Sequence, residues 1–452
     1  TLRVVATPEG YTKIKVTDDV HLAGKLFTDI AGSREEDLKN GSFEDVLSTQ
    51  EGTIQGNFEK YDDNSELFEF VPYITDDKKH MGLTPYAATG EHSLIAIANR
   101  LGAQRALGAA RTLDESFNLS PDKPLSRLFY SISDPEQAMS ALLQSLPTLS
   151  GASSQIVADS SQKLAQMSDQ RMDCASHSGP NVWAKTYGAW SRQGAYLGAS
   201  GYHGDSFGIA AGSDVCMNQS RLGFMVGYGN DFVESRQFPT RQTVRADTIQ
   251  AGMYGSTPLN EQWDVDFKAG VGYSFISTKR DIDFAHKQAE ADLHSTLAYA
   301  GVGLQALVIN TDYWQVRPFV RMDYLVVHNR SYEETGADVL NLHADSGNYQ
   351  TLVAQTGVKL RLQVADKVNA NALVAVGYNL LKDKPSTHAA FEGDRDRKFT
   401  TEGATHGRIS GQFGLDLSYQ VTPAARLSVG YDLMLRPNYV QHVPNVSFKY
   451  SF

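Results

Sequence analysis

The chain has 452 residues, which is too long for one ordinary domain, so two or three folded units are expected. Its formal net charge of −11 argues against nucleic acid as a partner. No run approaches the roughly 18 apolar residues of a transmembrane helix, whereas 38 Gly, 21 Tyr and 20 Phe against 2 Cys suit a β-barrel. The chain begins at Thr1 with no charged-then-apolar leader, so we expect a mature product or a fragment.

Residues 1–83 alternate apolar and polar residues in short runs separated by Gly and Asp/Asn turns. Such regularly punctuated strands predict either a small sandwich or the last rungs of a β-solenoid. An acidic cluster at residues 62–66 contains calcium-ligand types, but it lacks the Gly at the sixth position of a helix-loop-helix calcium loop. A solvated turn is therefore the favoured interpretation of this cluster.

Apolar residues at helical spacing begin near residue 83, and prolines divide the stretch up to residue 150 into segments, so we expect a helical linker over 84–150. A helix of small and polar residues follows from residue 151 to 172, with few large apolar side chains to bury it in a normal core. It is either a solvated linker helix or a slim helix threaded through a polar tube. Its small or acidic positions include Ala152, Ser154, Ala158, Asp159 and Asp169.

From Asn181 to Phe452 the sequence contains twelve strand-like segments bounded by Gly, Pro, Asn and Asp clusters. Each is long enough for the roughly 9–11 tilted residues with which a strand crosses a bilayer. They run approximately over 181–192, 202–215, 221–233, 243–257, 262–279, 291–308, 313–328, 350–364, 368–382, 407–421, 424–436 and 440–452.

Many of these segments place apolar residues on one side and polar or charged residues on the other. Trp263, Phe267 and Val271, for example, alternate with Asp264 and Lys268. Charged residues along one whole side of a strand cannot face lipid, so they should face a wet interior. The basic residues expected to face this interior are Arg317, Arg321, Lys359, Arg361, Arg408, Arg426 and Arg436.

The connections between the segments also alternate in length. Those after even-numbered segments are short, such as Ala365–Lys367, whereas those after odd-numbered segments include the long polar stretches 329–349 and 383–406. Short turns on one rim and long loops on the other are typical of outer-membrane barrels, with the short turns periplasmic. The sequence therefore predicts a mainly β fold with a 12-stranded antiparallel transmembrane β-barrel.

Two local patterns resemble catalytic or metal sites. Gly204–Gly208 matches the GxSxG nucleophile elbow, but that elbow needs a strand, a sharp turn and a helix, and here the motif runs on into a second strand. The nearby His203 is not made a base by sequence proximity. The remaining histidines lack the spacing of metal ligands. We expect no catalytic residue, no metal site and no cofactor.

The two cysteines suggest a link between the helix and the barrel. Cys174 lies just before the first barrel segment, and Cys216 lies in the first short turn, so the topology places both on the periplasmic rim. In an oxidising compartment such a pair is a candidate disulfide. Two free, partly buried thiols are the alternative.

The last segment ends the chain on an aromatic residue. Val446, Phe448, Tyr450 and Phe452 alternate with polar residues. This ending resembles the C-terminal signature of bacterial outer-membrane barrels, which the barrel assembly machinery is thought to read.

Taken together, these features resemble the C-terminal part of monomeric (type Va) autotransporters. The stretches that carry the resemblance cover most of residues 50–452. They are GTIQGNF, FVPYITDDKKHMGL, ALLQSLPTLSGASSQ, VWAKTYGAWSRQG, GYHGDSFGIAAGSDV and VSFKYSF.

The resemblance implies four parts: the end of a β-helical passenger (1–83), a linker (84–150), a lumen helix (151–178) and an outer-membrane translocator barrel (179–452). It implies export of the chain's own passenger to the cell surface, with outer-membrane lipid, the assembly machinery and periplasmic chaperones as partners. One feature departs from the family: some members cut themselves at an Asn-Asn pair in the lumen helix, and no Asn lies between Asn118 and Asn181.

Two other functions remain as alternatives. The first is a passive porin-like outer-membrane channel with an extra-membrane domain, and the second is a barrel enzyme with an active site on its loops. A translocator carrying the end of a surface passenger is the favoured hypothesis.

Overall fold

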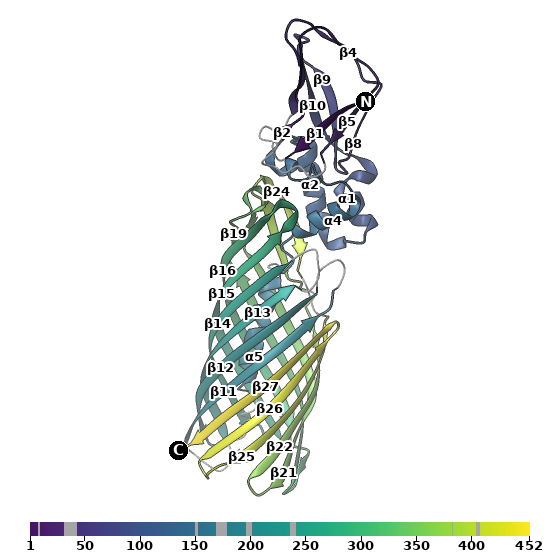
Figure 1. Cartoon of the computed structure of the whole chain (residues 1–452). Coiled ribbons are helices and arrows are strands. Elements are labelled where there is room, and N and C mark those ends of the chain that lie inside the picture. Colours follow the sequence, from purple (N-terminus) through teal and green to yellow (C-terminus); the bar gives the residue numbers. More distant parts are fainter. Residues whose placement is uncertain are drawn as a thin grey trace.

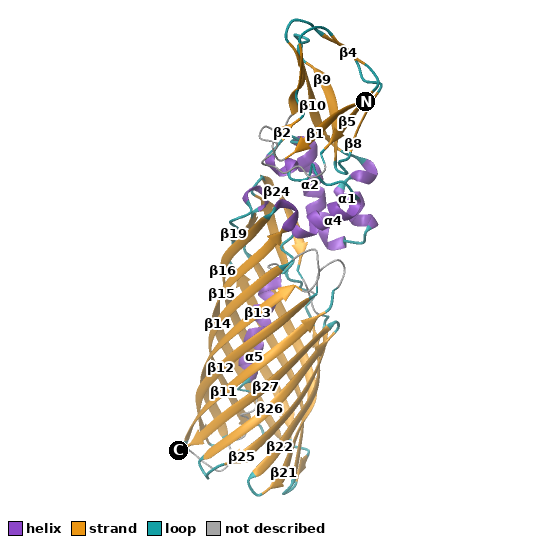
Figure 2. Ribbon diagram, viewed as in Figure 1, coloured by secondary structure: helices purple, strands orange, loops and turns teal. Residues whose placement is uncertain are grey.

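The computed structural model describes residues 1–7, 10–30, 43–149, 152–168, 179–195, 201–235, 241–381, 383–403 and 407–452. Figure 1 shows an N-terminal unit of small sheets and helices stacked on one end of a long barrel, with the C-terminus at the opposite end. Most helices lie between the small sheets and the barrel, and one lies inside the barrel (Figure 2).

The barrel is an antiparallel sheet of long strands, to which the two-residue strand β17 (Ile309–Asn310) adds a short pairing with β18. The twelve strand-like segments of the sequence correspond to these strands, with bounds that differ by a few residues. The long strands are β11 (Pro180–Gln193), β12 (Tyr202–Met217), β13 (Ser220–Ser235), β14 (Gln242–Pro258), β15 (Trp263–Ile282), β16 (Lys287–Ala306), β18 (Trp314–Asn329), β21 (Gly347–Ala365), β22 (Val368–Asn379), β25 (Ile409–Gln420), β26 (Ala425–Arg436) and β27 (Tyr439–Ser451).

The barrel is closed by its first and last strands. β27 pairs with β26 on one side and with β11 on the other, so that Val182 opposes Tyr450 and Trp183 opposes Lys449. On the far side β16 pairs with β18. Closure leaves no unpaired edge, which is the condition for a sheet in lipid.

Within the membrane the wall is apolar outside and polar inside. On β15 the outward residues from Trp263 to Phe275 are apolar, whereas Asp266 and Lys268 point inward and are buried. At about 3.3 Å per residue and a tilt of about 40°, that outward run spans about 30 Å along the membrane normal. This height matches the hydrocarbon core of a bilayer.

Above this apolar belt the polarity of the wall is reversed. Near the outer end of β14 the outward residues Arg245 and Asp247 are polar, whereas the inward Val244 and Ala246 are apolar and fully buried. Farther down the same strand the outward residue is Ile249. The upper part of the wall is therefore built like one side of a water-soluble protein, with its apolar face inside.

The strands are of unequal length. β14 to β16, β18 and β21 have 16 to 20 residues, whereas β22 and β25 to β27 have 12 or 13. Because the turns on the opposite rim are short, the extra length projects on the outer side, and β15 and β16 reach toward the N-terminal unit (Figure 1). The outer rim is therefore tall on one side and low on the other.

Two connections expected as long polar loops contain strands instead. The strands β19 (Tyr332–Glu333), β20 (Leu342–Ala344), β23 (Ser386–Phe391) and β24 (Asp394–Glu402) form a four-stranded sheet on the tall side. Leu342, Ala389 and Phe391 are buried in it. The sequence did not indicate this small core because only a few apolar residues supply it.

The N-terminal unit begins with short strands that pair in parallel. β1 (Leu2–Thr7) pairs with β5 (Lys25–Asp29), which in turn pairs with β8 (Lys60–Asp63). β3 (Ile14–Val16) pairs with β6 (Phe43–Thr49), and β4 (Val20–Leu22) pairs with β7 (Ile54–Gly56). Parallel stacking of successive turns of the chain is typical of β-solenoids. The antiparallel strands β2 (Gly10–Tyr11), β9 (Phe68–Ile74) and β10 (His80–Ala87) complete the sheets.

A group of short helices connects these sheets to the barrel. They are α1 (Leu94–Arg100), α2 (Leu107–Leu119), α3 (Pro124–Arg127) and α4 (Pro135–Gln144). α4 begins where Asp134 accepts a hydrogen bond from the Gln137 backbone N–H and Pro135 occupies the first turn. Asp114 accepts the backbone N–H groups of Leu94 and Ile95 at 2.9 Å each, and burial raises its pKa. No helix among the described residues combines the length and apolar character needed to cross a membrane.

Candidate functional site

The candidate site is the barrel lumen and the helix within it. α5 (Ser153–Gln166) packs against β12 to β15, β18 and β21 on the inner face of the barrel (Figure 2). Most of its residues are buried although it has few large apolar side chains. Of the two interpretations of this segment, the structure contains the slim helix threaded through the tube.

Small residues on the helix and on the wall allow this close packing. Ala152, Ser154 and Ala158 are all buried at the helix surface. Opposite them, a Cβ atom on Gly229 of β13 would lie only 2.8 Å from Ser160 Oγ. A larger residue at either place would push the helix away from the wall.

A buried charge cluster holds the lower half of the helix. The Lys163 ammonium donates to Asp231 Oδ1 at 3.2 Å and to Ser206 Oγ at 3.1 Å, and Ser206 donates to the same carboxylate oxygen at 2.6 Å. The side chains of Lys163 and Asp231 are only 7% and 4% exposed. The ammonium also lies 5.4 Å from the centre of the Tyr187 ring, where a cation–π interaction adds to the pairing.

Polar contacts also fix the upper part of the helix. Arg436 of β26 donates to Asp159 Oδ1 at 3.0 Å. Ser161 donates to Gln250 Oε1 at 2.8 Å. These contacts come from opposite sides of the barrel, so they fix the rotation of α5 as well as its height.

The helix does not fill the lumen. Two cavities, of about 510 and about 320 Å³, lie beside and below it along the wall formed by β21, β22 and β25 to β27. The seven basic residues expected to face the interior all line them. Arg317, Arg321, Lys359, Arg361 and Arg426 line the larger cavity, and Arg408 and Arg436 line the smaller one.

The wall itself supplies many of the partners of these basic residues. Arg317 contacts Asp264 at 2.9 Å, and Arg321 contacts Asp266 at 3.0 Å and Asp323 at 2.9 Å. Of these basic residues, Arg436 contacts the helix, whereas Arg317 and Arg321 are bonded to other strands of the wall.

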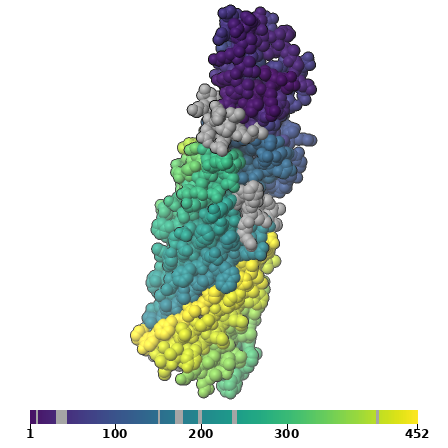
Figure 3. All heavy atoms as spheres, in the orientation of Figure 1, coloured from purple at the N-terminus to yellow at the C-terminus, as the bar shows by residue number. Residues whose placement is uncertain are grey.

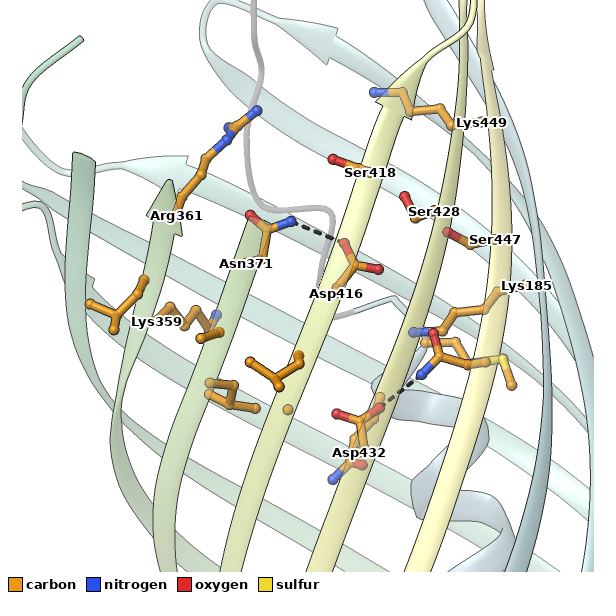
Figure 4. A pocket seen from close by; sticks show the side chains of 18 of the residues that line it. Lys185, Lys359, Arg361, Asn371, Asp416, Ser418, Ser428, Asp432, Ser447 and Lys449 are labelled. Atoms are coloured by element: carbon orange, nitrogen blue, oxygen red, sulfur yellow. Dashed lines mark hydrogen bonds between the residues drawn. The ribbon is translucent and has the colours of Figure 1, made fainter. Parts of the chain in front are cut away.

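The β25–β27 side of the larger cavity carries many polar side chains (Figure 4). Asn371 donates to Asp416 at 3.0 Å, and Asn445 donates to Asp432 at 3.0 Å. Lys185, Lys359 and Lys449 project into the same space. Amides and carboxylates therefore partner each other along this wall.

The GxSxG motif lies entirely within β12, as a strand and not as an elbow. Its serine, Ser206, points into the lumen and is part of the Lys163 cluster. His203 is three residues away, so it lies on the other face of the strand, where its nearest carboxylate is Glu234 at 3.8 Å. The motif is therefore part of the helix-binding wall.

Two predicted positions fall outside the described residues. They are Asp169 and Cys174, so the Cys174–Cys216 disulfide stays a prediction. Cys216 is buried near the C-terminal end of β12, and the Arg221 guanidinium lies 3.6 Å from its Sγ atom.

The four residues expected to form the assembly signal face outward on β27. Their exposed fractions range from 37% to 67%. The C-terminal residue is held by its backbone, which donates to the carbonyl oxygen of Pro180 at 3.1 Å. The exposed positions are Val446, Phe448, Tyr450 and Phe452.

Sequence reasoning missed Lys163, whose partner lies 68 residues away on another element. One signal was present: a lysine in a helix of small residues that enters a tube must either reach the rim or meet a carboxylate. It also missed Gln242 and Arg280, polar residues that point inward near the outer rim.

The chain resembles several known proteins in sequence. The model of the autotransporter beta-domain matches residues 182–432, more than half of the chain. Outer membrane protein B of Rickettsia typhi is 20% identical over all of this chain, which covers 29% of that protein. An extracellular serine protease of Serratia marcescens is 24% identical over 57% of this chain, with 25% of its own length covered. The chain thus spans little more than a quarter of these relatives.

Among solved structures, the translocator domain of autotransporter NalP from Neisseria meningitidis has the same fold. The TM-score is 0.55 at 16% identity, over 67% of this chain and 98% of that structure. At this identity the likeness shows the architecture, and the lumen contacts described above belong to this chain.

Proposed function

Because this chain belongs to the autotransporter family, we propose that residues 1–83 are the end of a passenger that, with the linker 84–150, reached the outside through the chain's own barrel. The barrel is an outer-membrane translocator domain of type V secretion, and this β-domain is itself non-catalytic. The observation that carries the proposal is α5, which runs through the lumen and joins the N-terminal unit to the barrel wall.

The energy for this export would come from the chain itself. The sequence has no GxxxxGK[ST] nucleotide-binding motif. The N-terminal unit buries residues from Val4 to Phe129 in a hydrophobic core, and that core forms only where the chain is free to fold. Folding outside the barrel would therefore bias movement outward.

The remaining partners belong to the same proposal. Val446, Phe448, Tyr450 and Phe452 lie exposed on the last strand, where the barrel assembly machinery would read them. Outer-membrane lipid would contact the apolar belt, and periplasmic chaperones would hold the chain before insertion. Ser206 is committed to the Lys163 cluster, which supports a structural role for the GxSxG motif.

One observation favours a second function, a passive channel. The two cavities beside α5 leave part of the lumen open to water. In such a channel the N-terminal domain would lie in the periplasm, on the opposite side of the outer membrane from the position that we propose.

Protease treatment of intact cells that express the chain separates these functions. The translocator predicts that residues 1 to about 100 are cut while a fragment that contains α5 and the barrel survives. If the N-terminal unit were cut only after the outer membrane was opened, it would be periplasmic and the channel would be the correct function.

A further inference from the structure

The upper wall of the barrel has an apolar inner face that needs a cover. We use upper wall for its inward residues above the membrane belt on β14 to β18: Val244, Ala246, Ile276, Ile282, Leu293 and Val327. All six are at most 2% exposed in the structure. If the lumen beside them were empty, this apolar face would be exposed to water, and the free-energy cost would grow with its area.

The linker is what covers it. Leu146 and Leu149, just after α4, belong to the same continuous buried cluster as the upper wall. The ring of Phe129 lies 5.1 Å from that of Phe284, which follows β15. Figure 3 shows the linker, in blue, seated directly against the outer end of the barrel.

Polar residues within the apolar wall recognise one short stretch of the linker. Gln242 donates to the Leu146 carbonyl oxygen at 2.8 Å and accepts the Leu149 backbone N–H at 2.8 Å. Arg280 donates to the Gln144 carbonyl oxygen at 2.8 Å. We call Gln242 and Arg280, with Asn329, the clamp.

Further contacts complete the recognition of this stretch. The Gln144 side chain accepts the backbone N–H of Phe284 at 3.1 Å. Asn329 donates to Ser153 Oγ at 3.2 Å, at the first residue of α5. This part of the chain is thus bonded on three sides, at Gln144, Leu146, Leu149 and Ser153, by β14, by β15 with the turn after it, and by β18.

The clamp is itself held rigidly. Arg280 is paired with Glu334 and also donates to the Leu340 carbonyl oxygen at 3.0 Å. Glu334 in turn accepts the Leu342 backbone N–H at 3.0 Å. Both charged side chains are at most 3% exposed. Because Leu342 belongs to β20, the pair is oriented before the linker arrives only if the four-stranded sheet of β19, β20, β23 and β24 has folded.

From this geometry we infer that the upper wall and its clamp are a docking site for the helical part of this chain's own linker, residues 94–149. Docking there sets the end point of export and holds the exported unit against the barrel. The inference rests on the proposed direction of export. Its physical basis is that the linker fits the site in two ways: its apolar side chains cover the apolar wall, and its backbone makes hydrogen bonds with the clamp. A segment of another sequence that passes through the barrel does not supply both.

The test uses the full chain in cells and three single substitutions. Gln242→Leu keeps the volume at the wall and removes both hydrogen bonds to the linker, and Gln144→Leu disrupts the site from the linker side with the barrel unchanged. Thr243→Leu is the matched control, because it is the next residue of β14 with its side chain on the opposite face. Barrel folding is read from heat-modifiable gel mobility, and export from an N-terminal epitope on intact cells.

The decisive readout is the rate at which added protease cuts within 94–149. We expect Gln242→Leu and Gln144→Leu to fold and to be exported. Linker cleavage should be about ten-fold faster in Gln242→Leu, which loses two hydrogen bonds between wall and linker, and faster by a smaller factor in Gln144→Leu, which loses one. Thr243→Leu should behave like the wild type. Unchanged linker resistance in both disrupting variants would overturn the docking site. A wild-type epitope absent from the surface would instead overturn the direction of export, and if one variant failed to fold, the other would still decide.

Discussion

At the scale of single residues, the Lys163–Asp231 pair shows why α5 stays in the lumen. Each side chain has given up nearly all of its hydration. A buried pair of this kind contributes little compared with an apolar pair of the same size, but the loss of one partner leaves a charge with no compensation. The main effect of the pair is therefore to raise the free energy of every other position of the helix, because any shift separates the two charges.

We predict that Lys163→Met or Asp231→Asn destabilises the seated helix by about 3–5 kcal/mol, whereas the double variant Lys163→Met/Asp231→Leu recovers much of this. The measurement is the denaturant dependence of α5 protection from protease in the folded barrel. The exposed pair Lys279–Glu290 serves as the control, where the loss of a partner should cost about 0–1 kcal/mol. Equal costs at the two pairs would show that burial does not matter here.

Asp63 is a second residue whose environment has a measurable effect. It lies on β8 and accepts the backbone N–H groups of Ser65 and Phe70 at 3.0 and 3.2 Å. Burial nevertheless raises its pKa from 3.8 to about 6, because the loss of hydration outweighs both bonds. The folded unit thus binds a proton more tightly than the unfolded chain does.

The sign of the pH effect follows from this difference. The contribution of Asp63 to stability is fully present below pH 3.8 and is lost as the pH rises through about 6. We predict that Asp63→Asn flattens the decline of N-terminal unit stability across this window, as measured by thermal proteolysis of the full chain. Asp62→Asn is the control, since Lys60 lowers the pKa of Asp62 and its effect lies at lower pH. An identical slope in wild type and Asp63→Asn would contradict the assignment.

At the scale of elements, each strand of the barrel meets lipid along one stretch and water along another. On β15, Val271 is 64% exposed in the middle of the apolar belt, and Ser277 lies on the same face beyond its upper end. A charge is costly only where no water can reach it.

We therefore predict that Val271→Arg lowers barrel stability by about 2–4 kcal/mol, whereas Ser277→Arg changes it by about 0–1 kcal/mol. The fraction of heat-modifiable, folded barrel recovered from membranes measures the difference. If both substitutions were tolerated equally, the belt would lie elsewhere along β15.

The elements also show what the sequence could predict. The strands were found correctly because alternation is local: Trp263 to Phe275 carries its own period of two, whatever it packs against. The contacts of the clamp could not be found in this way, since Gln242 and Leu146 are 96 residues apart and no local pattern pairs them. Lumen residues were predicted as a class, from the charged side of each strand, but their individual partners were not.

At the scale of the whole molecule, the two halves of the barrel have different tasks. The low half, β22 and β25 to β27, ends near the membrane and lines the open side of the lumen. The tall half continues above the membrane, reverses its polarity and carries the linker. The membrane protein and the exported unit consequently share one hydrophobic core.

The pairing of β27 with β11 has a consequence for the time course of synthesis. The ring cannot close until the ribosome has made β27, because this strand supplies both of the remaining ladders. The N-terminal unit is made before β27, so in the proposed export its exit exists only after that strand has been made. During that interval the N-terminal unit would have to stay unfolded, and the order of synthesis would be the reverse of the order in which the parts are used.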